Sequence, residues 1–338
     1  MTSRSVFPRR STSIRADGVL GRQLGRRLQP LVPVIVLIAL CLLITAANPR
    51  FLTWMNLGRV AASAAVPLVL SLGLTVVVLL GSIDLSIEGT MAIGSIVLSL
   101  LVANDMTGMR LGWLALPITL AATALVGAGN GLVHVWFRIP SFMVTLGTWF
   151  IGLGIAAVVL GGGTVRILDP QIRGLALARF VDLPWLVWVA VGALASAWVI
   201  QNYTRLGRHM YAVGGDENLA ALSGIRVRRV KVAAFALAGA FYGLASVLAV
   251  AQLGQANAVS GEGRLFTTVT AVVVGGTSLT GGIGGPLSSL VGVLIVVVLA
   301  NGMILLGISP YLQTTIQGLM IIVATAVGLD RRRIGIVK

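Results

Sequence analysis

Lysine is nearly absent from this chain of 338 residues, and the shortage excludes one class of chemistry. The Walker A motif, which cradles the phosphates of ATP, requires a Gly-Lys-[Ser/Thr] sequence. The two lysines of the chain, Lys231 and Lys338, each follow a valine, so neither can belong to such a motif. We therefore expect that ATP is not hydrolysed on this polypeptide.

Charged residues are also scarce. They make up 10% of the chain, whereas 57% of the residues are hydrophobic and the mean hydropathy is +0.98. A soluble domain carries about 25% charged residues, so this chain cannot cover a water-facing surface. The composition predicts a polytopic, all-α protein of the lipid bilayer. Its basic N-terminus leads into a long apolar run without a recognisable cleavage site, which we interpret as a retained first span and not a signal peptide.

Few residues could hold a metal ion or act as catalysts. The single cysteine, Cys41, falls within an apolar run, which excludes a disulfide and a cysteine-based metal site. His134 and His209 lie far apart and lack the HExxH spacing of a zinc site, and we interpret His134 as a polar residue at a helix end. Neither a GxSxG nor an HxE motif is present. The sequence thus indicates neither an enzyme nor a cofactor on this chain.

The positive charge of the chain, +15, is concentrated beside apolar runs. An excess of Lys and Arg in short loops marks the cytoplasmic side of a membrane protein, and such clusters also suit an anionic inner leaflet. We therefore expect no binding of nucleic acid. The basic clusters are Arg4, Arg9, Arg10, Arg15, Arg22, Arg26 and Arg27; Arg205, Arg208, Arg226, Arg228, Arg229 and Lys231; and Arg331, Arg332, Arg333 and Lys338.

Apolar runs of the length needed to cross a bilayer, about 20 residues, predict roughly ten spans, some of them short or broken. An even number of crossings places both termini and the basic stretch 202–231 in the cytoplasm. The segment 161–182 is then an external, non-helical loop. We expect a basic cytoplasmic tail at 1–27, a transmembrane domain at 28–330 and a second basic tail at 331–338. The predicted spans are 28–47, 61–80, 87–103, 111–137, 142–160, 183–200, 232–253, 265–280, 287–306 and 311–327, of which 265–280 is short or re-entrant.

The polar stretch 202–231 contains a short helix with clear ends. Asp216 can cap its first amides, and Glu217 places negative charge where the helix dipole is positive. Gly224 is suited to end it in the left-handed conformation. Two interpretations remain open on spacing alone, namely a connecting loop with one helical turn and a docking element for a soluble partner.

Acidic residues within the predicted spans are few, and Asp84 and Glu88 are the clearest. Carboxylates in a membrane are costly and usually face a cavity or a partner. Asp84, in the segment GSIDLSIEG, can cap the start of the third span, line a transport path or relay protons. An ion-coupled secondary transporter that uses Asp84 and Glu88 is therefore the alternative function, although such transporters are usually built from repeats that we do not detect here.

Four segments occur in this order along the chain: LGLTVVVLLGSIDLSIEGTMAI, IPSFMVTLGT, AVGGDENLAALSGI and AVVVGGTSLTGGIGG. They resemble, in the same order, the motifs of the monosaccharide-class permease subunits of bacterial ATP-binding-cassette importers. The resemblance implies a bacterial inner-membrane permease that imports a sugar or a sugar-like solute. It also implies a second permease copy or paralogue, an extracytoplasmic sugar-binding protein, and cytoplasmic ATP-binding subunits that hold ATP and magnesium.

The resemblance also assigns candidate residues. The stretch 202–231 resembles the cytoplasmic loop that docks into the ATPase, and Asp216 replaces the usual Asn, whereas Leu219 and Ala221 depart from the pattern. Leu265 and Thr267 stand where the family often has acidic residues, and Leu153 where it often has arginine. The predicted ATPase-coupling residues are Gly214, Gly215, Asp216, Glu217, Ala220, Leu222, Gly224 and Ile225. The predicted substrate path comprises Asp84, Ser86, Asn130, Phe142, Thr145, Thr148, Thr277 and Ser278.

Overall fold

Each predicted span corresponds to a helix in the computed structural model, which describes residues 31–328. The predicted tails at 1–27 and 331–338, and the first residues of the first span, lie outside this range. The membrane helices are α2 (Val32–Ala47), α3 (Trp54–Val78), α4 (Ile87–Leu101), α5 (Ala115–Phe137), α6 (Ser141–Leu160), α8 (Trp185–Tyr203), α11 (Val227–Leu253), α12 (Arg264–Val274), α13 (Pro286–Leu305) and α14 (Pro310–Gly328).

Not all of these helices can cross a membrane alone. Six stretches of the described chain are long and apolar enough, and they comprise α3, α5 with the short 3₁₀ turn η3 (Gly112–Leu114), α6, α8, α11 and α13. The 11 residues of α12 rise only about 16 Å, roughly half of the hydrocarbon thickness. The eighth predicted span is therefore short, as expected, and its residues 275–280 are non-helical.

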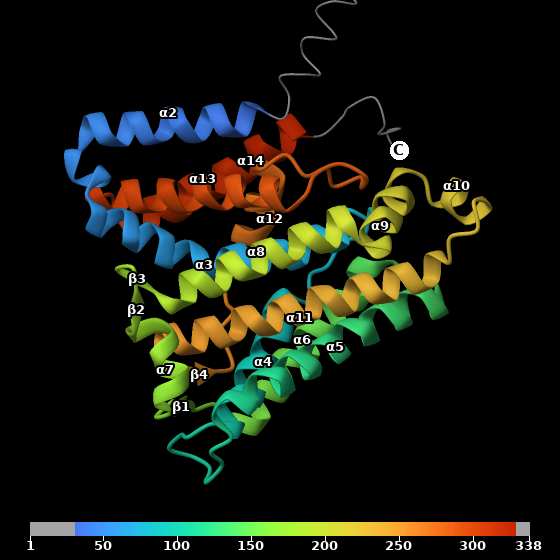
Figure 1. Cartoon of the computed structure of the whole chain (residues 1–338), viewed down its shortest axis with the longest axis horizontal. Coiled ribbons are helices and arrows are strands. Elements are labelled where there is room, and N and C mark those ends of the chain that lie inside the picture. The colour runs from blue at the N-terminus through green and yellow to red at the C-terminus, as the bar shows by residue number, and fades with distance from the viewer. Residues whose placement is uncertain (1–30, 329–338) are drawn as a thin grey trace, which may run out of the picture.

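The bundle has two distinct ends (Figure 1). At one end, the α10 end, lie α9 (Arg205–Gly215) and α10 (Glu217–Leu222). At the other, the α7 end, lie the short helix α7 (Pro170–Leu177) and four short strands. The stretch 202–231 and the loop 161–182 thus lie on opposite sides. The turn η2 (Pro49–Leu52) between α2 and α3 lies near the α13–α14 turn, because Asn48 Nδ2 donates to the carbonyl of Leu305 at 3.1 Å.

The prediction that 161–182 is non-helical is wrong. Strand β1 (Thr164–Arg166) pairs antiparallel with β4 (Gln255–Asn257), and β2 (Arg179–Phe180) pairs with β3 (Leu183–Pro184). Helix α7 begins where Asp169 accepts hydrogen bonds from the amides of Gln171, at 2.9 Å, and Ile172, at 3.2 Å. An Asp N-cap followed by proline at the first helical position is a start signal that the composition of the loop obscured.

The core lies around α3 and α11, which are mostly buried and pack against each other, whereas only 22% of the residues in the membrane stretches of α5 and of α6 are buried. Helix α11 approaches α5 so closely that Gly127 faces the backbone of Phe235 and Gly239 faces the backbone of Thr123. Small residues allow such contact between membrane helices, where water provides no hydrophobic driving force.

Candidate functional site

The α10 end is built from two helices, of which the sequence predicted only one. Helix α9 starts at Thr204, whose hydroxyl accepts a hydrogen bond from the Gly207 amide at 3.2 Å. Its buried face consists of Gly207, Met210 and Val213, at a spacing of three residues. The cap and this spacing were both visible in the sequence, but the surrounding charges made the segment look like a loop.

Helix α10 has the ends that the sequence predicted. The Asp216 carboxylate accepts a hydrogen bond from the Leu219 amide at 2.9 Å, as an N-cap does. At the other end Gly224 adopts a φ of 82°, and its amide donates to the carbonyl of Ala221 at 3.0 Å. The Ile225 amide donates to Ala220 at 3.1 Å, which completes a Schellman-like termination.

The predicted coupling residues divide into an inner and an outer set. Ala220 is buried in a cluster with Met210 and Val213 of α9, and Gly214 is half-buried. By contrast, Leu219 and Leu222 expose 61% and 84% of their surface, although α10 lies outside the apolar bundle. Two large apolar side chains in such a position form a surface on which another protein can dock. Gly215, Asp216 and Glu217 are also exposed, and Ile225 is half-buried.

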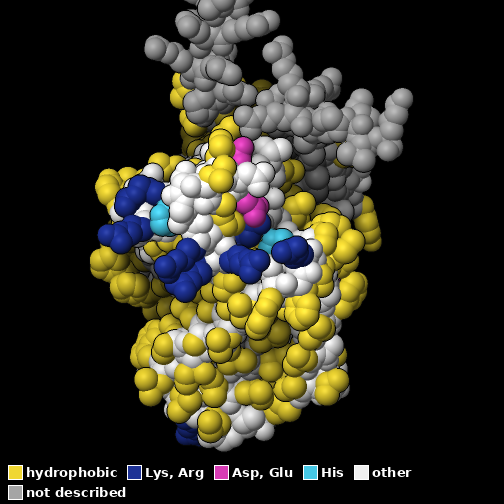
Figure 2. Space-filling model, turned by 90° about the vertical axis from the view of Figure 1, so that its right-hand side faces the viewer, with side chains coloured by type: hydrophobic (Ala, Val, Ile, Leu, Met, Phe, Trp, Pro, Cys, Tyr) yellow, Lys and Arg dark blue, Asp and Glu magenta, His cyan; other side chains and the backbone are white. Residues whose placement is uncertain are grey.

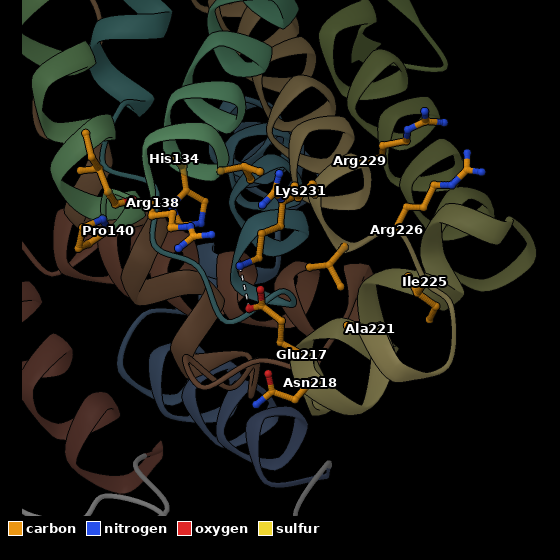
Figure 3. Close-up of a pocket in the computed structure, with 14 residues that line it drawn as sticks. His134, Arg138, Pro140, Glu217, Asn218, Ala221, Ile225, Arg226, Arg229 and Lys231 are labelled. Atoms are coloured by element: carbon orange, nitrogen blue, oxygen red, sulfur yellow. Dashed lines mark hydrogen bonds and ion pairs between the residues drawn. The ribbon is translucent and has the colours of Figure 1, made fainter.

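Basic side chains gather across the α10 end (Figure 2). A cavity of about 800 Å³ lies there between the α5–α6 turn and α10–α11, and its lining includes Arg138, Arg226 and Arg229. Across it Lys231 forms an ion pair with Glu217, with Nζ and Oε2 2.8 Å apart, whereas Arg226 and Arg229 point away from that pair (Figure 3). The pair ties α10 to the first turns of α11. The exposed arginines of this end are Arg138, Arg205, Arg208, Arg226, Arg228 and Arg229.

A second site lies at the non-helical segment 82–86, which forms the first part of the membrane crossing that α4 completes. Residues 82–86 are non-helical, and two of their amides are satisfied by side chains of α6. The Ile83 amide donates to Ser141 Oγ at 3.0 Å, and the Leu85 amide donates to Thr145 Oγ1 at 2.9 Å. Non-helical backbone at membrane depth persists only where protein or a cavity supplies such partners. Helix α6 is thus the element that stabilises the break.

Asp84 does not cap α4, contrary to the structural role considered for it. Its Oδ1 accepts hydrogen bonds from the amide and the hydroxyl of Ser86, at 2.8 and 2.6 Å, and Ser86 precedes the helix. The Tyr242 hydroxyl of α11 donates to Oδ2 at 3.3 Å. Only 2% of Asp84 is exposed. The Asp84 carboxylate therefore holds the non-helical segment 82–86 against α11.

The network continues into α5 and α6. Asn130 donates to Ser86 Oγ at 3.1 Å, and its carbonyl oxygen accepts a hydrogen bond from Thr148. Together with Thr145, these residues form a cluster of hydroxyl, amide and carboxylate groups, which we call the polar cluster: Asp84, Ser86, Asn130, Ser141, Thr145, Thr148 and Tyr242. The sequence predicted five of its members; Ser141 and Tyr242 were missed, because their contacts join distant parts of the chain.

Three predicted path residues lie elsewhere. Phe142 is exposed on α6. Thr277 is buried after α12, and Ser278 lies in the same turn, where its amide donates to the carbonyl of Ile283 at 3.0 Å. The structure thus places the glycine-rich turn 275–285 apart from the polar cluster.

Glu88 caps a helix other than its own. Its Oε1 accepts a hydrogen bond from the Leu265 amide at 3.0 Å, in the first turn of α12, and 5% of its surface is exposed. The starts of the two short helices α4 and α12 therefore meet through this carboxylate. A helix N-terminus favours negative charge, so the position stabilises Glu88. Arg264, the first residue of α12, lies beside it and was not singled out by the sequence.

The side chains of these sites can form hydrogen bonds and contacts with other proteins. Within residues 31–328 no group of three or more His, Cys, Asp or Glu could hold a metal ion. The polar cluster offers hydrogen-bond donors and acceptors with a single carboxylate that already has partners. Six of its seven members are buried, and the half-buried Thr148 lies at its edge.

Comparison with known proteins gives consistent relatives over most of the chain. The ribose import permease protein RbsC of Escherichia coli K12 is 32% identical over 87% of this chain and 92% of its own length. RbsC of Bacillus subtilis 168 is 33% identical over 95% of this chain and 96% of its own length. The galactose/methyl galactoside import permease protein MglC of Escherichia coli K12 is 29% identical over 86% of this chain and 91% of its own length. No solved structure matches significantly.

The chain is a multi-pass inner-membrane protein, and the resemblance found in its motifs is confirmed. A family of permeases is matched by residues 56–325, which include the polar cluster, α9, α10 and the glycine-rich turn. The chain therefore belongs to the family described as the permease component of the branched-chain amino acid transport system.

Proposed function

We propose that this chain is the membrane permease subunit of an ATP-driven importer that moves a monosaccharide into the cytoplasm. The observation that carries the proposal is α10, a capped helix with exposed Leu219 and Leu222 at the basic end of a permease-family bundle. The names of the relatives, which import ribose and galactose, support a sugar as the solute. The mostly neutral polar cluster is chemically suited to sugar hydroxyls.

Energy reaches this chain from a separate ATP-binding subunit that holds ATP and magnesium. Neither Lys231 nor Lys338 can form a Walker A motif, so the chain needs such a partner. That subunit docks on α10, which places α10 and both termini in the cytoplasm. The basic residues around α10 support this orientation, because positive charge marks the cytoplasmic side.

Substrate arrives at the α7 end. An extracytoplasmic sugar-binding protein docks near α7 and the β1–β4 pair, which form the most structured surface of that end. A second permease, an identical copy or a paralogue, completes the path. ATP-driven closure of the ATPases then displaces α10, and a rigid-body rearrangement switches access from outside to inside.

The competing function is ion-coupled secondary transport through Asp84 and Glu88. Both carboxylates already accept hydrogen bonds from backbone amides, of Ser86 and Leu265 respectively. These bonds favour a structural role over a proton relay. The two functions differ in their energy source, which an uptake assay can separate.

The experiment is uptake by the reconstituted complex. The chain is purified together with the ATP-binding subunit and the sugar-binding protein that associate with it, placed in liposomes, and supplied with radiolabelled ribose or galactose. We expect uptake of at least one sugar to require internal ATP and to persist when a protonophore collapses the proton gradient. Uptake that continues without ATP but stops with the protonophore would contradict the proposal.

A further inference from the structure

Three segments that are distant in the sequence cross at the α10 end without intervening side chains. They are the end of α3 at Gly81, the end of α9 at Gly214, and the turn after α12 at Gly281 and Gly282. A methyl group on Gly214 would overlap the carbonyl oxygen of Leu79 and lie 2.7 Å from the Gly282 nitrogen. One on Gly281 would lie 2.7 Å from the Gly81 nitrogen and 2.9 Å from the Gly214 oxygen. We call this crossing the glycine junction.

Hydrogen bonds hold the glycine junction together. The Gly282 amide donates to the carbonyl of Leu79 at 2.9 Å, which joins the turn 275–285 to α3. The Tyr211 hydroxyl donates to the carbonyl of Gly284 at 2.8 Å, which joins α9 to the same turn. Burial raises the pKa of the Tyr211 phenol, so the hydroxyl stays protonated and remains a donor. Helix α9 therefore contacts both of the other segments directly.

The junction is also continuous with α10. Ala220 of α10 packs in one buried cluster with Met210 and Val213 of α9 and with Val76 and Leu80 at the end of α3. Packed interiors transmit displacement because they contain few voids into which a side chain could yield. A movement of α10 thus reaches the end of α3 through α9.

From the junction the chain leads into both broken crossings. Directly after Gly81 come the non-helical residues 82–86, which contain Asp84 and Ser86 of the polar cluster. Before Gly281, the turn residues 275–280 lead back to the end of α12, whose first turn is capped by Glu88. The two short helices α4 and α12 thus meet at Glu88. The segments that connect them to the glycine junction, 82–86 and 275–280, are anchored there by the contacts of Gly81 and Gly281.

We propose that Gly214 and Tyr211 of α9 are positioning residues that transmit the displacement of α10 to the broken crossings of α4 and α12. The proposal rests on the function proposed above, in which an ATPase moves α10. Backbone meets backbone at Gly214, so no side-chain rotamer can absorb the movement there. Tyr211 adds a directional hydrogen bond that makes the turn 275–285 follow α9.

The first test separates ATP hydrolysis from transport in the reconstituted complex. Tyr211→Phe removes one hydroxyl, and Gly214→Ala adds one methyl group to the junction. Gly192→Ala is the matched control, because Gly192 is an exposed glycine of α8 and a methyl group on it has open space around it. We expect both test variants to hydrolyse ATP within twofold of the unmodified complex but to move about fivefold less sugar for each ATP, while the control is unchanged.

Two results would overturn the proposal. In one, Tyr211→Phe and Gly214→Ala move as much sugar for each ATP as Gly192→Ala does. In the other, ATP hydrolysis and uptake fall in the same ratio in both variants, since that is the signature of lost folded protein and not of lost coupling.

The second test needs neither a substrate nor an ATPase, so it remains informative if the proposed function fails. Hydrogen–deuterium exchange is measured on the purified chain in detergent. We expect Tyr211→Phe and Gly214→Ala to accelerate exchange at 79–86 and 276–285 about fivefold and to leave exchange in α6 unchanged. The Gly192→Ala control should show the exchange of the unmodified chain at all of these segments. Unaltered exchange at both segments in both variants would show that α9 does not hold them.

Discussion

Glu88 is a buried carboxylate whose hydrogen bond gives it a structural role. It lies in the first turn of α4 and accepts the Leu265 amide of α12, so it satisfies a backbone donor that would otherwise be unpaired at membrane depth. A lone buried donor costs about 1–3 kcal/mol. This role requires an acceptor oxygen, and it does not require a negative charge.

The first residue-scale prediction follows from that distinction. Glu88→Gln keeps an acceptor oxygen, so we expect sugar uptake and the thermal unfolding midpoint to stay near those of the unmodified protein. Glu88→Ala leaves the Leu265 amide unpaired and should lower the free energy of unfolding by about 1–3 kcal/mol. Thermal unfolding in detergent and uptake in liposomes provide the two measurements. A Glu88→Gln variant that folds normally but loses uptake would instead favour ion coupling.

Residue roles at the polar cluster could be predicted only in part. Asp84, Ser86, Asn130, Thr145 and Thr148 stood out because polar residues are rare in apolar runs. Their partners did not: Tyr242 lies 158 positions from Asp84, and the bond between them exists only once α11 packs against the break. The prediction that Asp84 caps α4 was wrong for a related reason. The amides that Asp84 and the side chains of α6 satisfy belong to the non-helical segment 82–86 and not to α4.

At the scale of elements, α10 offers a prediction through its C-terminal end. Gly224 has a φ of 82° and donates its amide to Ala221. Proline can adopt neither that angle nor that bond, so Gly224→Pro should disrupt the end of α10. We expect uptake to fall at least tenfold while ATP hydrolysis by the assembled complex continues.

Gly224→Asn is the matched control for this change, because asparagine tolerates the left-handed conformation. It should retain most of the uptake. Both variants are compared by sugar uptake and by phosphate release from the same liposomes. Normal coupled transport in Gly224→Pro would exclude a coupling role for the end of α10.

Elements with local signals were predictable and the others were not. The ends of α10 are set by Asp216 and Gly224, which act within four residues, and the structure confirms both. The cap of α7 at Asp169 is just as local, but the glycines and mixed charges of the loop concealed it. The pairing of β1 with β4 joins residues 164–166 to 255–257, and nothing near either strand specifies the other.

At the scale of the whole molecule, apolar runs determine the number and order of the membrane helices, because a bilayer requires runs of about 20 residues. The arrangement of these helices depends on contacts such as the α5–α11 crossing at Gly127 and Gly239, which involve small residues and leave little hydrophobic pattern. A chain with 42 glycines contains too many candidates for sequence alone to select the ones that make contact.

The outer face of α6 is the surface on which we expect the second permease chain. It exposes Gly147 and Gly154, seven residues apart, and a methyl group on either would meet open space. Exposed small residues in a membrane helix permit close approach of another helix. Thr148 of the polar cluster is half-buried at the edge of this face, so a second chain here would enclose the cluster on its open side.

Bulky substitutions on that face should therefore prevent pairing and leave the single chain intact. Gly147→Leu and Gly154→Leu should reduce the fraction of complexes with two permease chains at least tenfold, as measured by native mass spectrometry, and abolish uptake. Gly192→Leu is the control, since Gly192 is an exposed glycine of α8 with equally open surroundings. Unchanged thermal unfolding would confirm that each chain still folds. If Gly147→Leu and Gly154→Leu still yield paired, active complexes, the second chain must bind elsewhere, and the polar cluster would not be enclosed through α6.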